Sequence, residues 1–94
     1  MDVEFEWDED KAKHNVRKHR VKFEDGATIF HDPFIVTKLD SRHSDEEDRF
    51  ISVGFSIRGQ LLLVVHVERG ERIRIISCRK ATIAERKIYE KASE

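Results

Sequence analysis

The alternation of apolar and polar residues indicates a strand followed by a helix at the start of the chain. VEFEW at residues 3–7 alternates apolar with acidic side chains, as a half-buried strand does. Asp8 is a good N-cap for a helix over residues 8–20, which carries acidic residues in its first turn and basic residues at its end. Two polar residues share the stripe of this helix that should pack inward, which consists of Ala12, Asn15, Val16 and His19.

The next segment predicts a short helix, a strand and a loop. A helix fits residues 23–31 and ends before Pro33, and its apolar face consists of Phe23, Ala27 and Phe30. Residues 34–39 (FIVTKL) indicate a strand, and residues 40–48, with five acids and one arginine, indicate an exposed loop.

The clearest pattern is a three-stranded antiparallel meander in the second half of the chain. Residues 49–57, 60–68 and 71–78 are rich in apolar and β-branched side chains, and short turns that end in glycine separate them. The segment TIAE at residues 82–85 then has the pattern of a capping box and opens a final helix that ends near Lys91.

The order of these elements predicts an α+β fold with an antiparallel sheet, packed against two N-terminal helices and a C-terminal helix. The chain has 94 residues, which is enough for one domain over residues 1–94 and too few for two. A chain of this length buries only about 60–65% of its unfolded surface, so a permanent partner is expected to help stabilise it.

The turns of the meander give a trial register for its strands. If Arg58-Gly59 and Arg69-Gly70 are two-residue loops, one face brings together Ser52, Val65 and Arg74, and the other brings together Ile51, His66 and Ile73. The second face is the better core face, since it also carries Val53, Phe55, Ile57, Leu62, Val64 and Ile75. The first face predicts an open, hydrated groove of small polar residues around arginine, with Ser52, Gly54, Ser56, Arg72 and Arg74. A slip of one residue would exchange the two faces.

Charge is distributed unevenly along the chain, although the net charge is only −1. Residues 11–22 hold six Lys or Arg and no acid, and residues 69–91 hold eight Lys or Arg against three Glu. A solvated basic helix is one interpretation of residues 11–22. The other is an anionic partner, since six cations without an acid have no internal pairing.

The absence of several sequence signals narrows the expected class. Residues 1–7 are acidic and lack the apolar core of a signal peptide, and no apolar run approaches the ~18–20 residues that span a bilayer. The single cysteine excludes an intrachain disulfide, so a cytoplasmic location is the simplest expectation. There is no Gly-rich phosphate loop and no recurring metal-ligand spacing, so neither a cofactor nor a metal is expected.

Two groups of basic side chains are candidates for binding phosphate. Arg74 lies in the middle of an apolar strand, where it needs a partner: either an acid such as Glu71 or one from the helices, or a bound phosphate. Arg79 and Lys80 precede the capped helix, and free N–H groups there make either an anion site or ordinary charged surface.

The remaining candidates are a histidine, an acid and a thiol. His19 is either a packing residue or a proton-transfer group, whereas His66 falls on the predicted core face and is expected to be structural. Glu47 and Arg49 could pair across the start of a strand. Cys78 ends an apolar strand and is expected to be a buried, inert thiol.

Two stretches of the chain resemble the BrnT family. FEWDEDKAKHNVRKHRVKFEDGATIFHDP is similar to the family's Trp-Asp step, Lys-His-(Gly)-Val-x-Phe helix end and Asp-Pro turn. IRIISCRKAT, followed by Glu and Tyr, is the most specific part of the resemblance, which spans about residues 5–90. Arg20 stands where the family usually has Gly, and Cys78 where it usually has Ala.

The resemblance implies a RelE-like ribonuclease toxin that inhibits translation and is kept silent by a DNA-binding, BrnA-like antitoxin. In metal-independent cleavage the RNA 2′-OH attacks, and the protein moves protons and stabilises the phosphorane. On this resemblance Arg74 and Arg79 hold the phosphate, supported by Arg49 and Lys80. His19 transfers the proton, with Glu47 as the substitute. The remaining substrate contacts are expected from Lys18 and Tyr89.

Two other classes use the same residues. A non-catalytic nucleic-acid-binding module would lose affinity gradually as charge is removed, whereas an enzyme loses activity with one substitution. A protein-interaction domain, such as an antitoxin or adaptor, is the third class. An antitoxin usually carries a helix-turn-helix, a ribbon-helix motif or a disordered tail, and the sequence has none of these.

Overall fold

The computed structural model describes residues 3–43 and 47–94. Its elements follow the predicted order: β1 (Glu4–Glu6), α1 (Glu9–His19), α2 (Phe23–Ala27), the 3-10 turn η1 (Thr28–His31), β2 (Val36–Leu39), the 3-10 turn η2 (Ser41–His43), β3 (Arg49–Phe55), β4 (Leu61–Arg69), β5 (Arg72–Lys80) and α3 (Ile83–Ala92). The single helix expected over residues 23–31 is divided into α2 and η1.

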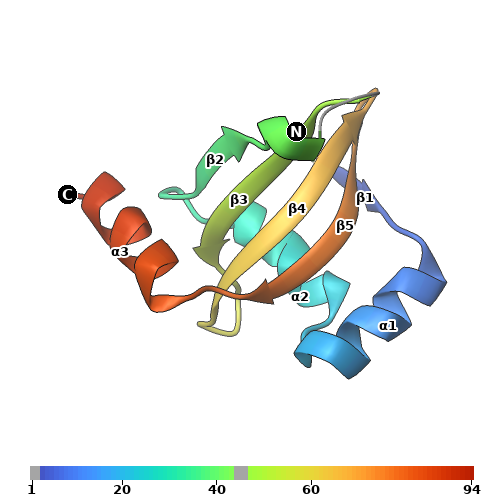
Figure 1. The fold of residues 1–94 in the computed structure, drawn as a ribbon, viewed down its shortest axis with the longest axis horizontal. Helices are drawn as coiled ribbons and strands as arrows, with labels where there is room; N and C mark the ends of the chain where they lie inside the picture. Colours follow the sequence, from blue (N-terminus) through green and yellow to red (C-terminus); the bar gives the residue numbers. More distant parts are fainter. Residues whose placement is uncertain (1–2, 44–46) are drawn as a thin grey trace.

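The five strands form one sheet in the order β1-β5-β4-β3-β2 (Figure 1). The pairs β2–β3, β3–β4 and β4–β5 are antiparallel, as predicted, whereas β1 pairs in parallel with β5. The α+β class is therefore confirmed, with a short parallel edge strand added to an antiparallel sheet.

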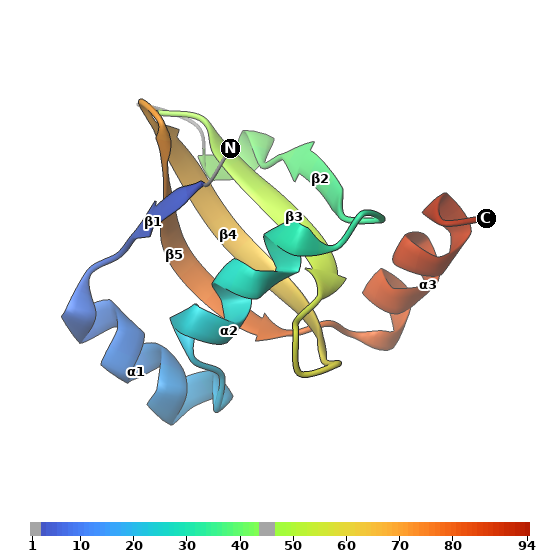
Figure 2. The same ribbon diagram turned by 180° about the vertical axis from the view of Figure 1, so that it is seen from behind.

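The helices divide unequally between the two faces of the sheet. Figure 2 shows α2 and η1 crossing one face, and α1 beside them next to β5. In Figure 1 the other face, which we call the open face, carries no helix over its centre, and α3 stands beside the end of β3. The buried core lies on the helix-covered face and consists of Val21, Phe23, Ile29, Leu62, Val64, Ile75 and Cys78.

Local sequence signals explain where the two longest helices, α1 and α3, begin. The Asp8 side chain accepts a hydrogen bond from the N–H of Lys11, which caps α1 as predicted. At α3 the Thr82 side chain accepts from the N–H of Glu85, and the Glu85 side chain accepts from the N–H of Thr82. The predicted capping box is therefore confirmed.

The trial register of the meander is wrong. Ser52 lies opposite Val64 rather than Val65, because the β3–β4 connection closes through Ser56 N–H donating to the carbonyl of Gln60. That loop is one residue longer than expected, with Gly59 at φ 80°. The β4–β5 turn is also displaced, and a β-bulge between Val65 and His66 shifts the register again.

This slip exchanges the faces of β3. Ser52 is fully buried under the helices, and a Cβ at Gly54 would lie 3.3 Å from η1, so neither lines an open groove. Ile51 and Val53, expected in the core, lie on the open face instead. The predictions for β5 and His66 stand: Arg74 is on the open face, and His66 is buried.

Candidate active site

The open face has an apolar centre between two charged ends. The centre is a concave pocket of about 300 Å³ whose apolar lining is Val36, Ile51, Val53, Leu63, Val65 and Ile88. Its polar lining is His19, Lys38, Ser77, Arg79, Glu85 and Tyr89. The pocket therefore draws side chains from α1, from four strands or their ends, and from α3.

Arg79 is fixed at one end of this pocket by Glu85. The Arg79 Nη1 and Nη2 atoms each donate to one oxygen of the Glu85 carboxylate at 2.8 Å. One of these oxygens also accepts from the N–H of Thr82. The hydrogen bond from Arg79 lowers the pKa of Glu85 to about 2, so this carboxylate stays ionised and is a poor proton acceptor near neutral pH.

The Glu85 carboxylate therefore occupies the N-terminus of α3, where an anion site was one of the two expectations. Within the described chain the Arg79 guanidinium uses Nη1 and Nη2 toward Glu85, and Nη1 also donates to the carbonyl of Lys80. Its Nε–H and one Nη2–H have no protein acceptor there. This edge of the guanidinium has the two-donor geometry that binds a phosphate.

Tyr89 closes the same end of the pocket. It is buried, and its hydroxyl donates to Asp32 at 2.6 Å. Burial and this hydrogen bond raise the pKa of Tyr89 to about 12, so the hydroxyl keeps its proton. Burial alone would raise the pKa of Asp32, but hydrogen bonds from the Phe55 N–H, Tyr89 and the Phe34 N–H outweigh it and leave that pKa below its usual value.

His19 is the last residue of α1, and its side chain lines the pocket at the edge of β5. Its pKa is lowered, first by burial and then by the positive charges of Lys18, Arg79 and His14. A lowered pKa keeps the imidazole neutral near neutral pH. His19 can then accept a proton from a group bound in the pocket.

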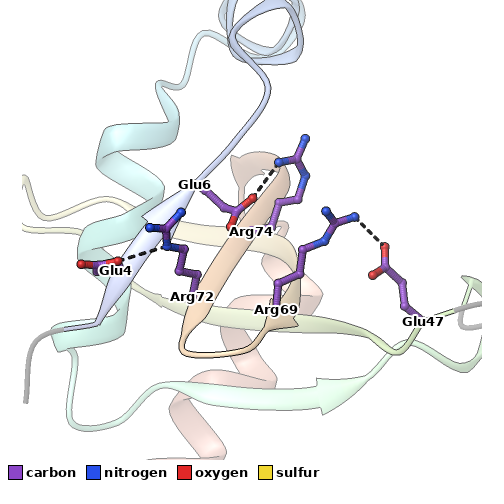
Figure 3. Close-up of polar contacts among 6 residues, drawn as sticks. All are labelled: Glu4, Glu6, Glu47, Arg69, Arg72 and Arg74. Carbon is purple, nitrogen blue, oxygen red and sulfur yellow. Dashed lines mark hydrogen bonds and ion pairs between the residues drawn. The ribbon is translucent and has the colours of Figure 1, made fainter.

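The other end of the open face is a cluster of arginines paired with glutamates (Figure 3). Arg74 lies 2.9 Å from Glu6, Arg72 3.1 Å from Glu4 and Arg69 3.5 Å from Glu47, each measured between nitrogen and carboxylate oxygen. The ion pair considered for Arg74 is therefore present. Its partner is a β1 residue, not Glu71 or a helix acid, because β1 pairs in parallel beside β5 with Glu6 opposite Arg74.

The predicted site residues thus divide into two groups. His19, Arg79 and Tyr89 meet at the pocket, while Glu47, Arg49 and Arg74 lie at the arginine cluster. Arg49 and Arg74 flank Val67 in one cross-strand row, and Arg79 lies five residues beyond Arg74, about 16 Å along β5. Lys18 and Lys80 are exposed, and Lys80 points to the opposite face of β5 from Arg79.

Sequence reasoning missed three polar residues that line the pocket, which are Lys38, Ser77 and Glu85. It also missed Asp32, which accepts the hydrogen bond of the Tyr89 hydroxyl. Glu85 was recognised only as a capping residue, and its second role toward Arg79 depends on the β5–α3 connection. Asp32 precedes Pro33 in the Asp-Pro turn of the resemblance, and no sequence pattern points to its role beside Tyr89. Its contact with Tyr89 joins residues 57 apart in sequence.

The described residues offer neither a cluster of metal ligands nor a membrane-spanning helix. Across residues 3–43 and 47–94, no three His, Cys, Asp or Glu side chains gather in a way that could hold a metal ion. Within these ranges, no helix has the length and apolarity needed to cross a membrane.

Comparison with known proteins relates the chain to a solved structure and to a family. The crystal structure of the Brucella abortus ribonuclease toxin BrnT shares the fold with a TM-score of 0.63 and 23% sequence identity, over 86% of this chain and 99% of that chain. A search of curated proteins found no match. The profile of the family described as "Ribonuclease toxin, BrnT, of type II toxin-antitoxin system" matches residues 7–85. Because that match covers most of the sequence, the chain belongs to the BrnT family of type II toxin–antitoxin ribonuclease toxins.

Proposed function

We propose that this chain is an endoribonuclease that cleaves RNA in the pocket at Arg79, without a metal ion, and so inhibits translation. The observation that carries the proposal is the meeting of His19, Arg79 and Tyr89 at one pocket, although they come from α1, β5 and α3. A proton acceptor and a fixed guanidinium within one concave site are what attack by a 2′-OH needs.

Each of these side chains has a defined part in the proposed reaction. Neutral His19 accepts the 2′-OH proton while the 2′-oxygen bonds to phosphorus. The bond from phosphorus to the 5′-oxygen then breaks, and the departing 5′-oxygen takes up a proton from water. The free Nε–Nη2 edge of Arg79 stabilises the charge on the phosphorane oxygens, with Glu85 holding the guanidinium in place. The Tyr89 hydroxyl keeps its proton and donates a hydrogen bond to Asp32. Tyr89 therefore positions the substrate and does not transfer a proton.

The arginine cluster contributes substrate binding away from the bond that breaks. Arg74 would hold a second phosphate, together with Arg49 on the other side of Val67 in the same row. That phosphate must compete with Glu6 for the Arg74 guanidinium. Glu47, expected as the substitute proton acceptor, lies at this cluster, is about half exposed and contacts Arg69, so it could accept a proton only from an RNA bound there and not from one bound at Arg79. Lys18 and Lys80 add positive charge near the pocket.

Membership of a type II toxin–antitoxin family implies an antitoxin partner. We propose that this partner is a DNA-binding, BrnA-like protein. It would cover the open face of the toxin in the cytoplasm and link it to DNA only indirectly. Carboxylates or an apolar segment placed over the pocket would block RNA, and binding would also raise the stability of a small core by mass action.

The test is cleavage of RNA by the purified chain in the presence of EDTA. We expect cleavage to persist and to leave a 2′,3′-cyclic phosphate or a 3′-phosphate, because the 2′-oxygen is the nucleophile. A strict requirement for Mg²⁺ or Mn²⁺ would contradict the proposal. Lys87→Ala, an exposed change on α3 outside the pocket, is the matched control for preparations of site variants.

A non-catalytic RNA-binding module is the alternative, and growth of bacteria that express the chain separates the two. An enzyme arrests growth when expressed alone, and Arg79→Ala alone relieves the arrest at equal protein level. If soluble wild-type protein accumulates without harming growth, the toxin function is wrong.

A further inference from the structure

Within residues 3–43 and 47–94, the cations of α1 and of the turn that follows it differ from four arginines of β4 and β5 in having no side-chain partner. In the described chain, the structure gives no side-chain hydrogen bond or ion pair to Lys11, Lys13, Arg17, Lys18, Arg20 or Lys22. Arg69, Arg72, Arg74 and Arg79 are each paired with a glutamate. At those arginines a phosphate has to displace a carboxylate or bind beside one, as at Arg79, whereas it meets free positive charge at α1.

One stripe of these cations lines a second concave surface at the edge of the sheet. Lys11, His14 and Lys18 occur at spacings of three and four residues, so they lie on one side of α1. They line this hollow together with Asp10, Asn15, His19, Ile76 and Ser77. Lys13 and Arg17 belong to the other side of the helix and do not line it.

This hollow continues the candidate active site, since His19 and Ser77 line both the hollow and the pocket on the open face. A strand of RNA that crosses the pocket can therefore pass over the edge of β5 and onto α1 without leaving a concave surface. Lys11 and Lys18 are separated by about 10 Å along the helix axis, so the stripe extends the site by that length.

We propose that the RNA strand on one side of the cleaved bond leaves the pocket over His19 and Ser77. Its phosphates are then held by the α1 groove, which we define as Lys11, His14 and Lys18. This inference rests on RNA being the substrate. It adds a binding surface for a single strand, read through its charge and not through its bases.

The proposal is tested by binding of a 2′-O-methyl oligoribonucleotide, which lacks the nucleophilic hydroxyl and cannot be cleaved. The variant Lys11→Gln/Lys18→Gln is compared with Lys13→Gln/Arg17→Gln, which removes the same charge from the other side of the same helix. We expect the first pair to weaken binding at least tenfold. It should also lower the slope of log affinity against log salt by about 1.4, the effect of two lost phosphate contacts on a single strand.

The control pair should weaken binding less than threefold, and Lys11→Arg/Lys18→Arg should bind as the wild type does. Equal losses from the two glutamine pairs would mean a general field around α1 and would overturn the groove. Absence of RNA binding by the wild type would overturn it as well. If Lys11→Gln/Lys18→Gln weakens antitoxin binding while RNA binding is intact, α1 is a protein interface and the inference is wrong.

Failure of the inference differs from failure of the proposed function. The bound oligonucleotide is not cut, so groove-dependent binding can be observed whether or not the chain is a nuclease. Conversely, cleavage of RNA together with indifference of binding to Lys11 and Lys18 supports the nuclease and rejects the groove. Melting temperatures of both glutamine pairs verify that these exposed changes leave the fold intact.

Discussion

The side-chain amide of Asn15 hydrogen-bonds both backbone groups of Cys78, donating to its carbonyl oxygen at 2.7 Å and accepting from its N–H at 3.1 Å. β1 pairs with residues 72–74 of β5, and among the described residues no strand lies along the outer edge of β5 beyond that point. Asn15 takes the place of that strand. It also donates to the carbonyl of Val21, which ties the end of α1 to the sheet.

Asn15→Ala should lower the free energy of unfolding by about 2–4 kcal/mol, because it leaves two buried backbone groups of Cys78 without a partner. Urea unfolding at neutral pH measures this change. Lys13→Ala, an exposed change on the same helix, should remain within about 0.5 kcal/mol of the wild type. A loss for Asn15→Ala as small as that of the control would mean that the amide does not hold α1 to β5.

The close approach of α2 to β5 at Gly26 gives a second stability prediction. A Cβ at Gly26 would lie 2.8 Å from the Cys78 Sγ and 3.3 Å from the Val64 Cγ2. Gly26→Ala should therefore destabilise the protein by about 1–3 kcal/mol through overpacking. In a Cys78→Ala background, which removes the sulfur, the same change should cost less.

The double-mutant cycle for Gly26 and Cys78 is measured by urea unfolding of the four proteins. A favourable coupling of about 1 kcal/mol or more is expected. Additive effects would contradict the proposed contact. The cycle also tests the nature of Cys78, whose thiol is fully buried and whose pKa is raised to about 12 by burial and by Asp25. The prediction of a buried thiol is confirmed.

His66 makes stability depend on pH. Its Nε2 contacts the Ser52 hydroxyl at 2.8 Å, and the ring packs against Phe30 and Phe50. Its buried Nδ1 has no hydrogen-bond partner in the part of the chain that the structure describes. Burial lowers the pKa of His66 to about 4 from 6.5. The unfolded chain therefore binds a proton between pH 6.5 and 4 that the folded chain does not, so stability falls as pH falls through this window.

Between pH 7 and 4.5 the free energy of unfolding should decrease by on the order of 2–3 kcal/mol because of His66. His66→Gln should remove most of this slope, whereas His19→Gln, at a histidine with a smaller shift in the same direction, should retain most of it. Urea unfolding at several pH values measures both. If His66→Gln is too unstable, an NMR titration of the wild-type ring should give a pKa well below 6.5, and an ordinary value would reject the argument.

The secondary structure could be predicted from the sequence because it depends on local signals. The Asp8 cap, the Thr82–Glu85 capping box and the alternation in the meander all occur within a few neighbouring residues. The strand register could not be predicted. It depends on whether Gly59 closes a loop of two residues or three, and one residue decides which face of β3 is buried.

The candidate site was predicted only in part, because local sequence identifies some of its residues and the tertiary fold sets the contacts of the others. Arg79 and Tyr89 are named by the motif that resembles the family, and His19 by its place on the inward stripe of α1. The contact of Tyr89 with Asp32 and the partner of Arg74 depend on the tertiary fold, because β1 and η1 approach from far along the chain. Asn15 is a polar residue on the inward stripe of α1, and it is buried. Its place there was a sign of a specific tertiary contact.

Arg20 has the strained backbone that its departure from the family pattern suggests. It follows α1 with φ 60° and ψ 30°, a left-handed conformation that an L-residue with a side chain adopts at a cost. Arg20→Gly should raise the free energy of unfolding by about 1 kcal/mol, measured by urea unfolding. Lys22 has an ordinary backbone φ of −85°, so Lys22→Gly relieves no strain and adds freedom to the unfolded chain. It should therefore lower the free energy of unfolding. A decrease for both variants would mean that Arg20 is held by contacts that outweigh the strain.

The last prediction concerns the division of labour between Arg79 and Glu85. Arg79→Ala removes the guanidinium at the pocket and should lower kcat by about 10²–10³-fold, the usual cost of losing a donor to the reacting centre. Glu85→Gln keeps the capping geometry and one acceptor for Arg79, but it removes the charge that aligns the two Nη atoms. It should therefore lower kcat less, by about tenfold, while binding of uncleavable RNA is unchanged or tighter because a competing carboxylate is lost. Single-turnover cleavage and equilibrium binding on the same preparations separate the two effects. An Arg79→Ala variant that cleaves normally but binds RNA weakly would make Arg79 a simple binding residue, and the reacting phosphate would then have to lie elsewhere on the open face.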